Sequence, residues 1–279
     1  MMNSMFADAP FETVLPLQPG ITQHFDHYME YLADSRDGLP ILYYQFHVPL
    51  KHSGFCPLLP GGCIDILFPY GGQPAVSLVY GSVRSRSELL LQPGTSYFAV
   101  RLLPVALAPI AQIPLKELVD HSVPLQALLS FARCLELRIQ SRALSFRERI
   151  TAFQEEMNCL TQPSQRRHES EPKELLPAVR QIYLAHGNLS LAELSRMMNR
   201  STRHVRYVFE EFIGLPPKTF CRIVRFQQAV SRLLQPGRTV FNDIISESGY
   251  YDQAHFIREF KTFVRECPTL FLANHFKRL

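Results

Sequence analysis

The stretch Gly249-Tyr-Tyr-Asp-Gln-Ala-His-Phe-Ile-Arg-Glu-Phe-Lys261 decides the fold of the last third of the chain. Asp252 is a favoured N-cap residue, and the apolar Phe256, Phe260 and Phe263 that follow recur at the spacing of one helix face. The stretch also repeats an earlier one. A shift of 51 residues aligns Ser195 with Ser246, His204 with His255, Phe209 with Phe260, Phe212 with Phe263, Pro217 with Pro268 and Phe220 with Phe271. This internal repeat indicates that one supersecondary unit occurs twice.

Each copy of the repeat predicts two short helices joined by a tight turn. In the first copy, Ser190 caps a helix over 191–198 and Ser201 caps a second helix. The second copy predicts a helix over 240–248 and another that starts after Asp252. A helix, a tight turn and a second helix with an exposed polar face form the unit whose second helix can enter a DNA major groove.

A longer helix is predicted between the two copies, from Pro217 to Leu234. At about 1.5 Å per residue its length is about 27 Å. Neighbouring major grooves on one face of B-DNA are about 34 Å apart. A helix of this length can therefore hold two recognition helices near consecutive grooves.

The polar faces of the two second helices are predicted to contact double-stranded DNA. An Arg can donate two hydrogen bonds to guanine, a Gln can do the same for adenine, and an apolar side chain can contact the thymine methyl group. For His204 and His255, which share one repeat position, we expect a phosphate contact or a packing role in place of base readout. The predicted DNA-binding residues are Thr202, Arg203, His204, Arg206, Tyr207, Gln253, Ala254, His255, Ile257 and Arg258.

Residues 191–271 resemble the tandem helix-turn-helix domain of the AraC/XylS family of transcription regulators, most specifically at 249–261 and Pro268. The resemblance implies a bacterial, sequence-specific regulator of promoter or operator DNA, commonly an activator that contacts RNA polymerase. The chain departs from the family pattern at Tyr207, where an Arg is usual, and at Arg265, where a Gly is usual. Because of Tyr207, the base preference of the first motif is not carried over from the family.

The first part of the chain is predicted to be rich in β-strands. Turns that contain Gly and Pro separate short runs of strand-forming residues at 41–48, 64–68, 77–80 and 97–102. Strands at this spacing predict a small antiparallel barrel or sandwich. The predicted fold class is α+β, with a barrel-like (cupin-like) domain first and an all-α domain after it. Residues 58–68 and 98–101 resemble the sensor-type domain of some family members, which implies a small effector or a role in dimerisation.

Residues 125–162 contain neither Gly nor Pro, which favours helices. Ser145 and Glu148 have the spacing of a capping box. An apolar stripe follows, formed by Phe146, Ile150, Phe153 and Met157. We expect the stripe either to close this domain's own core or to form a homodimer interface. The predicted organisation is a β-rich sensor domain over 1–122, a helical segment over 123–162, a linker over 163–174 and a DNA-binding domain over 175–279.

Charge is unevenly distributed along the chain. Residues 173–279 carry 16 Lys and Arg against 9 Asp and Glu, whereas the whole chain has a formal net charge of +4. A basic C-terminal part indicates a polyanionic partner. No apolar run is long enough for a membrane helix and no secretory signal is recognised, so a cytoplasmic protein without membrane contact is expected. The scattered cysteines indicate free thiols in a reducing compartment.

No enzymatic activity and no cofactor are predicted, because the chain lacks a nucleophile elbow, a P-loop and a dinucleotide-binding turn. His47 and His52 lack the HxH-plus-Glu pattern of metal-binding cupins, so no metal site is predicted. Asp65, on an otherwise apolar strand, is expected to be a hydrogen-bonded structural carboxylate. Two alternatives to a regulator of this family remain. One is a DNA-alkylation-repair regulator, which would need clustered cysteines, and the other is a non-specific architectural DNA-binding protein.

Overall fold

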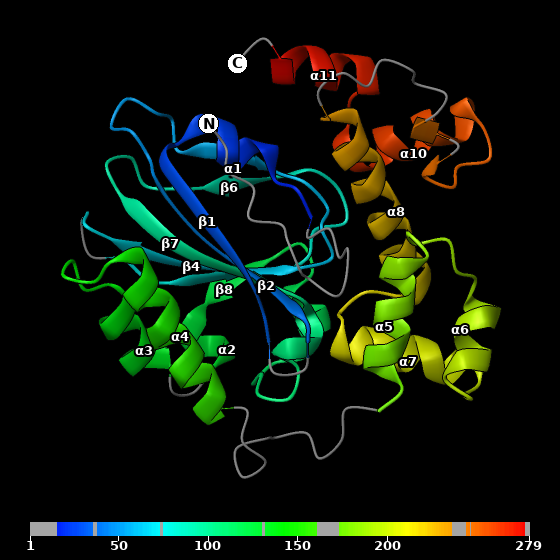
Figure 1. Cartoon of the computed structure of the whole chain (residues 1–279), viewed down its shortest axis with the longest axis horizontal. Coiled ribbons are helices and arrows are strands. Elements are labelled where there is room, and N and C mark those ends of the chain that lie inside the picture. Colours follow the sequence, from blue (N-terminus) through cyan, green and yellow to red (C-terminus); the bar gives the residue numbers. More distant parts are fainter. Residues whose placement is uncertain are drawn as a thin grey trace.

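The computed structural model describes residues 16–35, 38–72, 75–129, 132–160, 173–235, 244–245 and 247–276. A region of β-strands flanked by helices comes first, and an all-helical region follows it (Figure 1). The predicted α+β class is therefore confirmed. Within these ranges, no helix combines the length and the apolar character needed to span a membrane.

Six antiparallel strands form one sheet in the order β1-β2-β7-β4-β5-β8. They are β1 (Asp26–Asp34), β2 (Pro40–His47), β4 (Ile64–Tyr70), β5 (Leu78–Tyr80), β7 (Ser96–Leu102) and β8 (Ser122–Pro124). A separate two-stranded ribbon pairs β3 (Phe55–Leu58) with β6 (Ser87–Leu90). The predicted class is correct, but the predicted barrel is wrong, because the sheet does not close on itself. β1 and β8 lie at opposite edges of the sheet, which is open because β8 is only three residues long and pairs with β5 alone.

Alternate residues of the sheet face two different cores. On one face, the ring of Tyr43 lies 6.0 Å from that of Phe153, in the helix that covers this side. On the other face, Phe46 stacks on Tyr97 with a centroid distance of 5.4 Å and belongs to a second apolar cluster that includes residues of the β3–β6 ribbon. The short helix α1 (Pro19–His24) packs on that ribbon side, next to β3.

Helices α2 (Leu125–Leu128), α3 (Ala132–Ile139) and α4 (Phe146–Leu160) cover the first face of the sheet (Figure 1). α4 begins at the predicted capping box, where the Ser145 backbone N–H donates to Glu148 Oε2 at 2.7 Å. In the apolar stripe of α4, Ile150 and Phe153 are buried, and Phe146 and Met157 are partly buried against the same core. The stripe thus packs on this chain's own sheet, the first of the two roles that we expected.

The predicted linker over 163–174 lies outside the described residues, except for Lys173 and Glu174. The helical region then consists of α5 (Leu175–Leu184), α6 (Leu191–Met197), α7 (Thr202–Phe212), α8 (Pro217–Leu233), α10 (Gln253–Val264) and α11 (Pro268–Phe276). Most of the helix predicted over 240–248 also lies outside the described residues.

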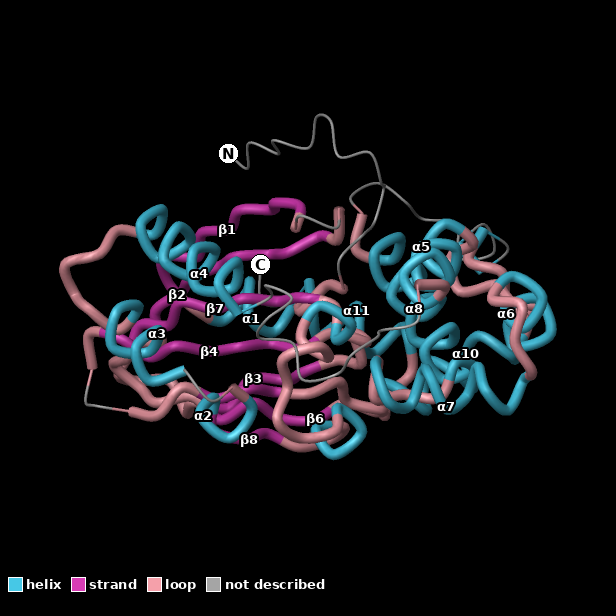
Figure 2. The backbone as a smooth tube through the Cα atoms, turned by 90° about the horizontal axis from the view of Figure 1, so that it is seen from below, coloured by secondary structure: helices cyan, strands magenta, loops and turns pink. Residues whose placement is uncertain are grey.

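The two regions share one continuous hydrophobic core. Figure 2 shows the helical region beside one end of the strands. There, the ring of Phe220 on α8 lies against Gly62, where an added Cβ would be 3.0 Å from the Phe220 Cε2 atom. In the same way, Gly214 after α7 lies against the backbone of Leu115, in the short 3-10 helix η2 (Leu115–Leu118). The helical region therefore rests directly on the sheet region.

Candidate nucleic-acid interface

Helices α6 and α7 form the first helix-turn-helix motif. The Ser190 side chain accepts from the Glu193 backbone N–H, and the Glu193 side chain accepts from the Ser190 backbone N–H, which closes a capping box at the start of α6. Leu194 of α6 and both Val205 and Phe209 of α7 are buried in the common core. These contacts fix α7 across α6 and determine which face of α7 remains free.

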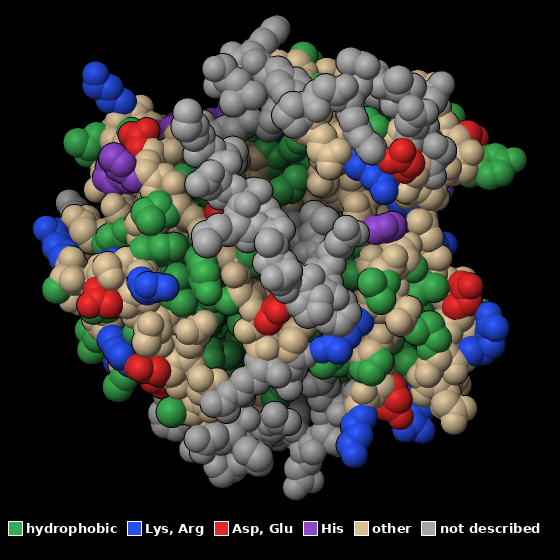
Figure 3. All heavy atoms as spheres, in the orientation of Figure 1, with side chains coloured by type: hydrophobic (Ala, Val, Ile, Leu, Met, Phe, Trp, Pro, Cys, Tyr) green, Lys and Arg blue, Asp and Glu red, His purple; other side chains and the backbone are tan. Residues whose placement is uncertain are grey.

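That free face carries the residues predicted to contact DNA. All five of its predicted members are exposed: Thr202, Arg203, His204, Arg206 and Tyr207. The helix begins at Ser201, whose Oγ accepts from the His204 backbone N–H at 3.2 Å. The amino-terminal end of a helix carries a partial positive charge that favours phosphate. In Figure 3, Lys and Arg side chains lie on the lower right of the molecule, where Figure 1 places α5, α6 and α7.

Two residues in the turns were missed by the sequence analysis. Arg200, between α6 and α7, is exposed and pairs with Glu174 at 3.2 Å. At the matching position of the second repeat, Tyr251 is 93% exposed. Each residue immediately precedes the N-cap of a recognition helix, a position from which a side chain can reach the DNA backbone. A large side chain in a turn, outside any apolar row, is the signal that could have identified both.

The outer face of α10 is less uniform than that of α7. Gln253, Ala254 and Arg258 are exposed as predicted, whereas His255 and Ile257 are half-buried. α10 therefore presents fewer free side chains for base contacts than α7 does.

The start of α10 explains the burial of His255. Asp252 is the N-cap, as predicted, and its Oδ1 accepts from the His255 backbone N–H at 2.6 Å. The His255 ring packs edge-on against Tyr250, with a centroid distance of 5.4 Å. Its Nε2 lies 4.0 Å from a Glu259 carboxylate oxygen. This geometry agrees with the packing role that was one of the two expected for His255.

Glu259 is a buried carboxylate that joins α10 to α8. Its oxygens accept from Arg222 Nε at 2.8 Å and from Arg225 Nη2 at 3.3 Å. Burial and the nearby Glu259 charge together raise the pKa of the Tyr250 hydroxyl well above its usual value. The ion pairs fix the angle of α10 on α8. The sequence analysis missed them, although an acidic residue beside a row of buried phenylalanines requires cationic partners.

The spacer helix α8 has 17 residues, one fewer than predicted, and is about 25 Å long. Phe226, at the middle of α8, contacts the rings of Phe260 and Phe263 in α10 at 5.6 and 4.9 Å. Phe220, near its amino end, contacts Phe209 of α7 at 6.1 Å. α7 is thus held near the amino end of α8 and α10 at its middle, and Figure 2 places both toward the same side of the molecule.

The carboxyl end of α10 docks on the loop between β5 and β6. Arg265 adopts the left-handed conformation, with φ of 64°, and its Nη2 donates to Ser85 Oγ at 3.1 Å. The Arg86 backbone N–H donates to the Phe263 carbonyl oxygen at 2.6 Å, and its guanidinium pairs with Glu266 at 3.0 Å. At this position, where the family resemblance implies a Gly, the Arg keeps the left-handed helix end and adds a contact to the sheet region.

Asp65 is a structural carboxylate, as predicted. It accepts from Arg101 Nε at 2.9 Å, from Arg101 Nη2 at 3.0 Å and from the Tyr44 hydroxyl at 2.8 Å. Burial opposes the charge of Arg101, but the neighbouring Asp65, Tyr44 and Cys63 together outweigh burial and raise the pKa of the guanidinium above its usual value. Among the described residues, no group of three His, Cys, Asp or Glu side chains is placed to hold a metal ion.

Two segments of the chain match known families. Residues 194–274 match the family described as a helix-turn-helix domain. Residues 43–124 match a domain of unknown function (DUF6597). No curated protein matches the chain.

Solved structures of ToxT from Vibrio cholerae are similar to this chain. A structure of one crystal form of ToxT has 11% identity and a TM-score of 0.41, covering 88% of this chain and 97% of that chain. Unsaturated fatty acid bound wild-type ToxT has 11% identity and a TM-score of 0.39, covering 88% of this chain and 93% of that chain. ToxT bound to (E)-4-(8-methylnaphthalen-1-yl)but-3-enoic acid has 11% identity and a TM-score of 0.42, covering 89% and 98% of the two chains.

Proposed function

We propose, from the AraC-type helix-turn-helix domain that residues 194–274 form, that this chain is a sequence-specific transcription regulator that reads double-stranded DNA with α7 and α10. The observation that carries the proposal is the pair of helices with exposed polar faces, α7 and α10, that pack on one rigid helix, α8. Two recognition helices held on one rigid helix let one chain contact two segments of the major groove.

We assign the base contacts to Arg203 and Arg206 of α7 and to Gln253, Ile257 and Arg258 of α10. Arg203, Arg206 and Arg258 are exposed, and their guanidinium groups make no hydrogen bond or ion pair with any described residue, so these groups are available to guanine or phosphate. The remaining predicted positions line the same faces and are assigned to the DNA backbone and groove walls; they are Thr202, His204, Tyr207, Ala254 and His255.

We further propose that the β-rich region responds to a small effector or mediates homodimerisation, and that the protein acts in the bacterial cytoplasm as an activator that contacts RNA polymerase. The family resemblance supports these roles. The shared core supports the response to an effector, because the sheet region packs in one core with α7 and α8 and a change in it would move these helices. A homodimer would use a surface other than the α4 stripe, which is occupied by the sheet.

The cysteines favour this proposal over an alkylation-repair regulator. Burial raises the pKa of both Cys56 and Cys63 to about 12, so these thiols stay protonated and poorly nucleophilic at neutral pH. Among the described residues, cysteines form no cluster that could hold zinc.

Selection of binding sites from a random DNA library with the full chain tests the proposal. The selected site should bind about a thousandfold or more tightly than unrelated DNA of equal length. The logarithm of the binding constant should fall linearly with the logarithm of the salt concentration, because phosphate contacts release counterions. Equal affinity for every sequence would identify an architectural DNA-binding protein, and absence of binding would refute both.

A further inference from the structure

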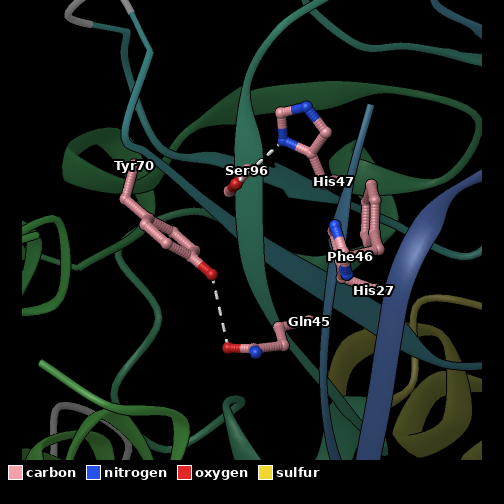
Figure 4. A pocket seen from close by; sticks show the side chains of 6 residues that line it. All are labelled: His27, Gln45, Phe46, His47, Tyr70 and Ser96. Atoms are coloured by element: carbon pink, nitrogen blue, oxygen red, sulfur yellow. Dashed lines mark hydrogen bonds between the residues drawn. The ribbon is translucent and has the colours of Figure 1, made fainter. Parts of the chain in front are cut away.

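A polar pocket of about 310 Å³ opens at the end of the sheet, where β1, β2, β4 and β7 meet (Figure 4). It is lined by His27, Gln45, Phe46, His47, Tyr70 and Ser96. Ser96 is the direct strand partner of both His47 and Tyr70, so side chains from three adjacent strands converge on one point. The volume is near the lower end of the range of small-molecule sites, about 300–1,000 Å³. The pocket therefore suits a compact ligand.

The pocket lies on the face of the sheet that α4 covers. Gln45 and His47 alternate with Tyr44 and Phe46 along β2 and so share the side of Tyr43, which contacts Phe153 of α4. Phe46, which also lines the pocket, belongs to the apolar cluster on the ribbon side of the sheet.

The hydrogen bonds within the pocket leave donors available to a ligand. His47 Nδ1 and Ser96 Oγ are 3.0 Å apart, which leaves the Nε2 edge of His47 without a partner among the described residues. The Tyr70 hydroxyl donates to Gln45 Oε1 at 3.3 Å (Figure 4), so the acceptor of that amide is occupied. Gln45 Nε2 has only a weak sulfur acceptor, Met29 Sδ at 3.3 Å. The lining of the pocket is therefore rich in N–H and O–H groups.

The charges around the pocket are also favourable to an anion. No Asp or Glu lines it. Asp26 on β1 is the strand partner of His47, but it is exposed and is not among the lining residues. The buried guanidinium of Arg149 stacks on the ring of Tyr70, with Cζ 3.8 Å from the centroid, and places a fixed positive charge behind the wall.

From this lining we propose that the pocket binds a small anionic metabolite through an oxyanion group, either a carboxylate or a phosphate. The Nε2–H of His47 and the Gln45 amide donate to the oxyanion, the Ser96 hydroxyl donates to His47 Nδ1 and so holds that tautomer, and the Tyr70 ring forms a wall. The role of this anion as an effector rests on the proposed function. Binding of the anion does not itself require that the chain bind DNA. Arg149 of α4 stacks on the Tyr70 ring, so the wall of the pocket is in contact with α4.

Isothermal titration calorimetry on the full chain tests the site, with succinate and inorganic phosphate as probes of the two oxyanion classes and succinamide as the neutral counterpart of succinate. At least one anion should bind with 1:1 stoichiometry, and succinamide should not. His47→Ala should weaken binding about tenfold or more, since a hydrogen bond to a charged group contributes about 1.5–3 kcal/mol. Ser96→Ala should weaken binding as well, because it removes the partner that orients the His47 ring. His121→Ala, at an exposed histidine near β8, is the matched control and should bind as the wild type does.

Three results would overturn the site: no heat with either anion, equal binding of succinamide, or unchanged affinity in both His47→Ala and Ser96→Ala. Thermal unfolding of each variant shows whether it is folded, and Ser96→Ala keeps the test valid if His47→Ala does not fold. Failure of the proposed function has a different signature. In that case the chain binds the anion but does not discriminate between DNA sequences.

Discussion

The Gln227 side-chain amide of α8 donates to the Pro60 carbonyl oxygen at 2.6 Å, across the boundary between the helical region and the sheet region. Its Oε1 accepts from the Leu17 backbone N–H at 2.9 Å, and Gln227 itself is buried. One side chain thus satisfies two backbone groups of the sheet region. Because a buried backbone group without a partner is costly, Gln227 is a specific link between the two regions.

Replacing this link should destabilise the whole chain. Gln227→Ala leaves the Pro60 carbonyl and the Leu17 amide without their partner, and it should lower the free energy of unfolding by about 1–3 kcal/mol. Urea denaturation measures the loss. Gln228→Ala, at the half-buried neighbouring residue, is the matched control and should change the free energy by no more than about 0.5 kcal/mol. Equal effects of the two substitutions would mean that the Gln227 contacts contribute nothing.

Arg206→Ala should leave the fold intact and weaken DNA binding, because the side chain is exposed opposite the buried face of α7. If Arg206 binds a guanine, the loss should be about 1–3 kcal/mol and the preference at one base pair should relax. If it contacts only phosphate, every sequence should bind more weakly and the salt slope should fall by about one. Library selection with the variant distinguishes the two outcomes.

Arg258→Ala applies the same measurement to α10, and Arg133→Ala, at an exposed arginine of α3, is the control for a general loss of positive charge. We expect a base-specific effect for Arg258, because its motif matches the family pattern more closely. If affinity and sequence preference are unchanged in both Arg206→Ala and Arg258→Ala, then α7 and α10 are not the reading helices.

Glu259→Gln should weaken DNA binding although Glu259 does not face the DNA. The substitution removes the charge that pairs with Arg222 and Arg225, so the angle of α10 on α8 is less well fixed. Stability should fall by about 1.5–3 kcal/mol, the usual contribution of a hydrogen bond to a charged group. Glu88→Gln, at an exposed residue of β6, is the control. The idea fails if Glu259→Gln lowers the unfolding temperature but binds the selected DNA site with full affinity.

Phe153→Ala should destabilise the chain by about 3–5 kcal/mol, because its ring is fully buried between α4 and the sheet. Changing both Ile150 and Phe153 to Glu should give an insoluble or unfolded product. Thr151→Ala, on the exposed side of the same helix, should behave as the wild type does. A folded, soluble monomer of the double Glu variant in sedimentation would instead restore the α4 stripe as a dimer interface.

Features encoded by neighbouring residues could be predicted from the sequence. The caps at Ser190, Ser201 and Asp252 and the exposed face of α7 are such features, since a period of 3.6 residues and one capping side chain determine each of them. The runs predicted as strands correspond to β2, β4, β5 and β7, all of which lie inside the sheet and carry continuous apolar residues.

Features that depend on distant residues could not be predicted in this way. β1 was missed because it is an edge strand with exposed residues along most of its length, and its pairing is interrupted by a bulge near His27, which has a positive φ of 54°. Whether the sheet closes depends likewise on its two edge strands, β1 and β8, which are far apart in the sequence. The partners of Glu259 and the residues around the polar pocket converge only in the folded chain.

The contact of Phe220 with Gly62 has a consequence for how this protein can be recombined. Gly62 has a positive φ of 67°, and any side chain there would meet the Phe220 ring at about the distance of closest contact. The two regions are therefore complementary in shape at this contact. A chimaera that joins this sheet region to the DNA-reading region of another regulator should fold only if the incoming helix has a ring and a backbone of the same shape at that point. Exchange of recognition helices alone, which leaves α8 in place, is the route by which new DNA specificity can be grafted onto this protein.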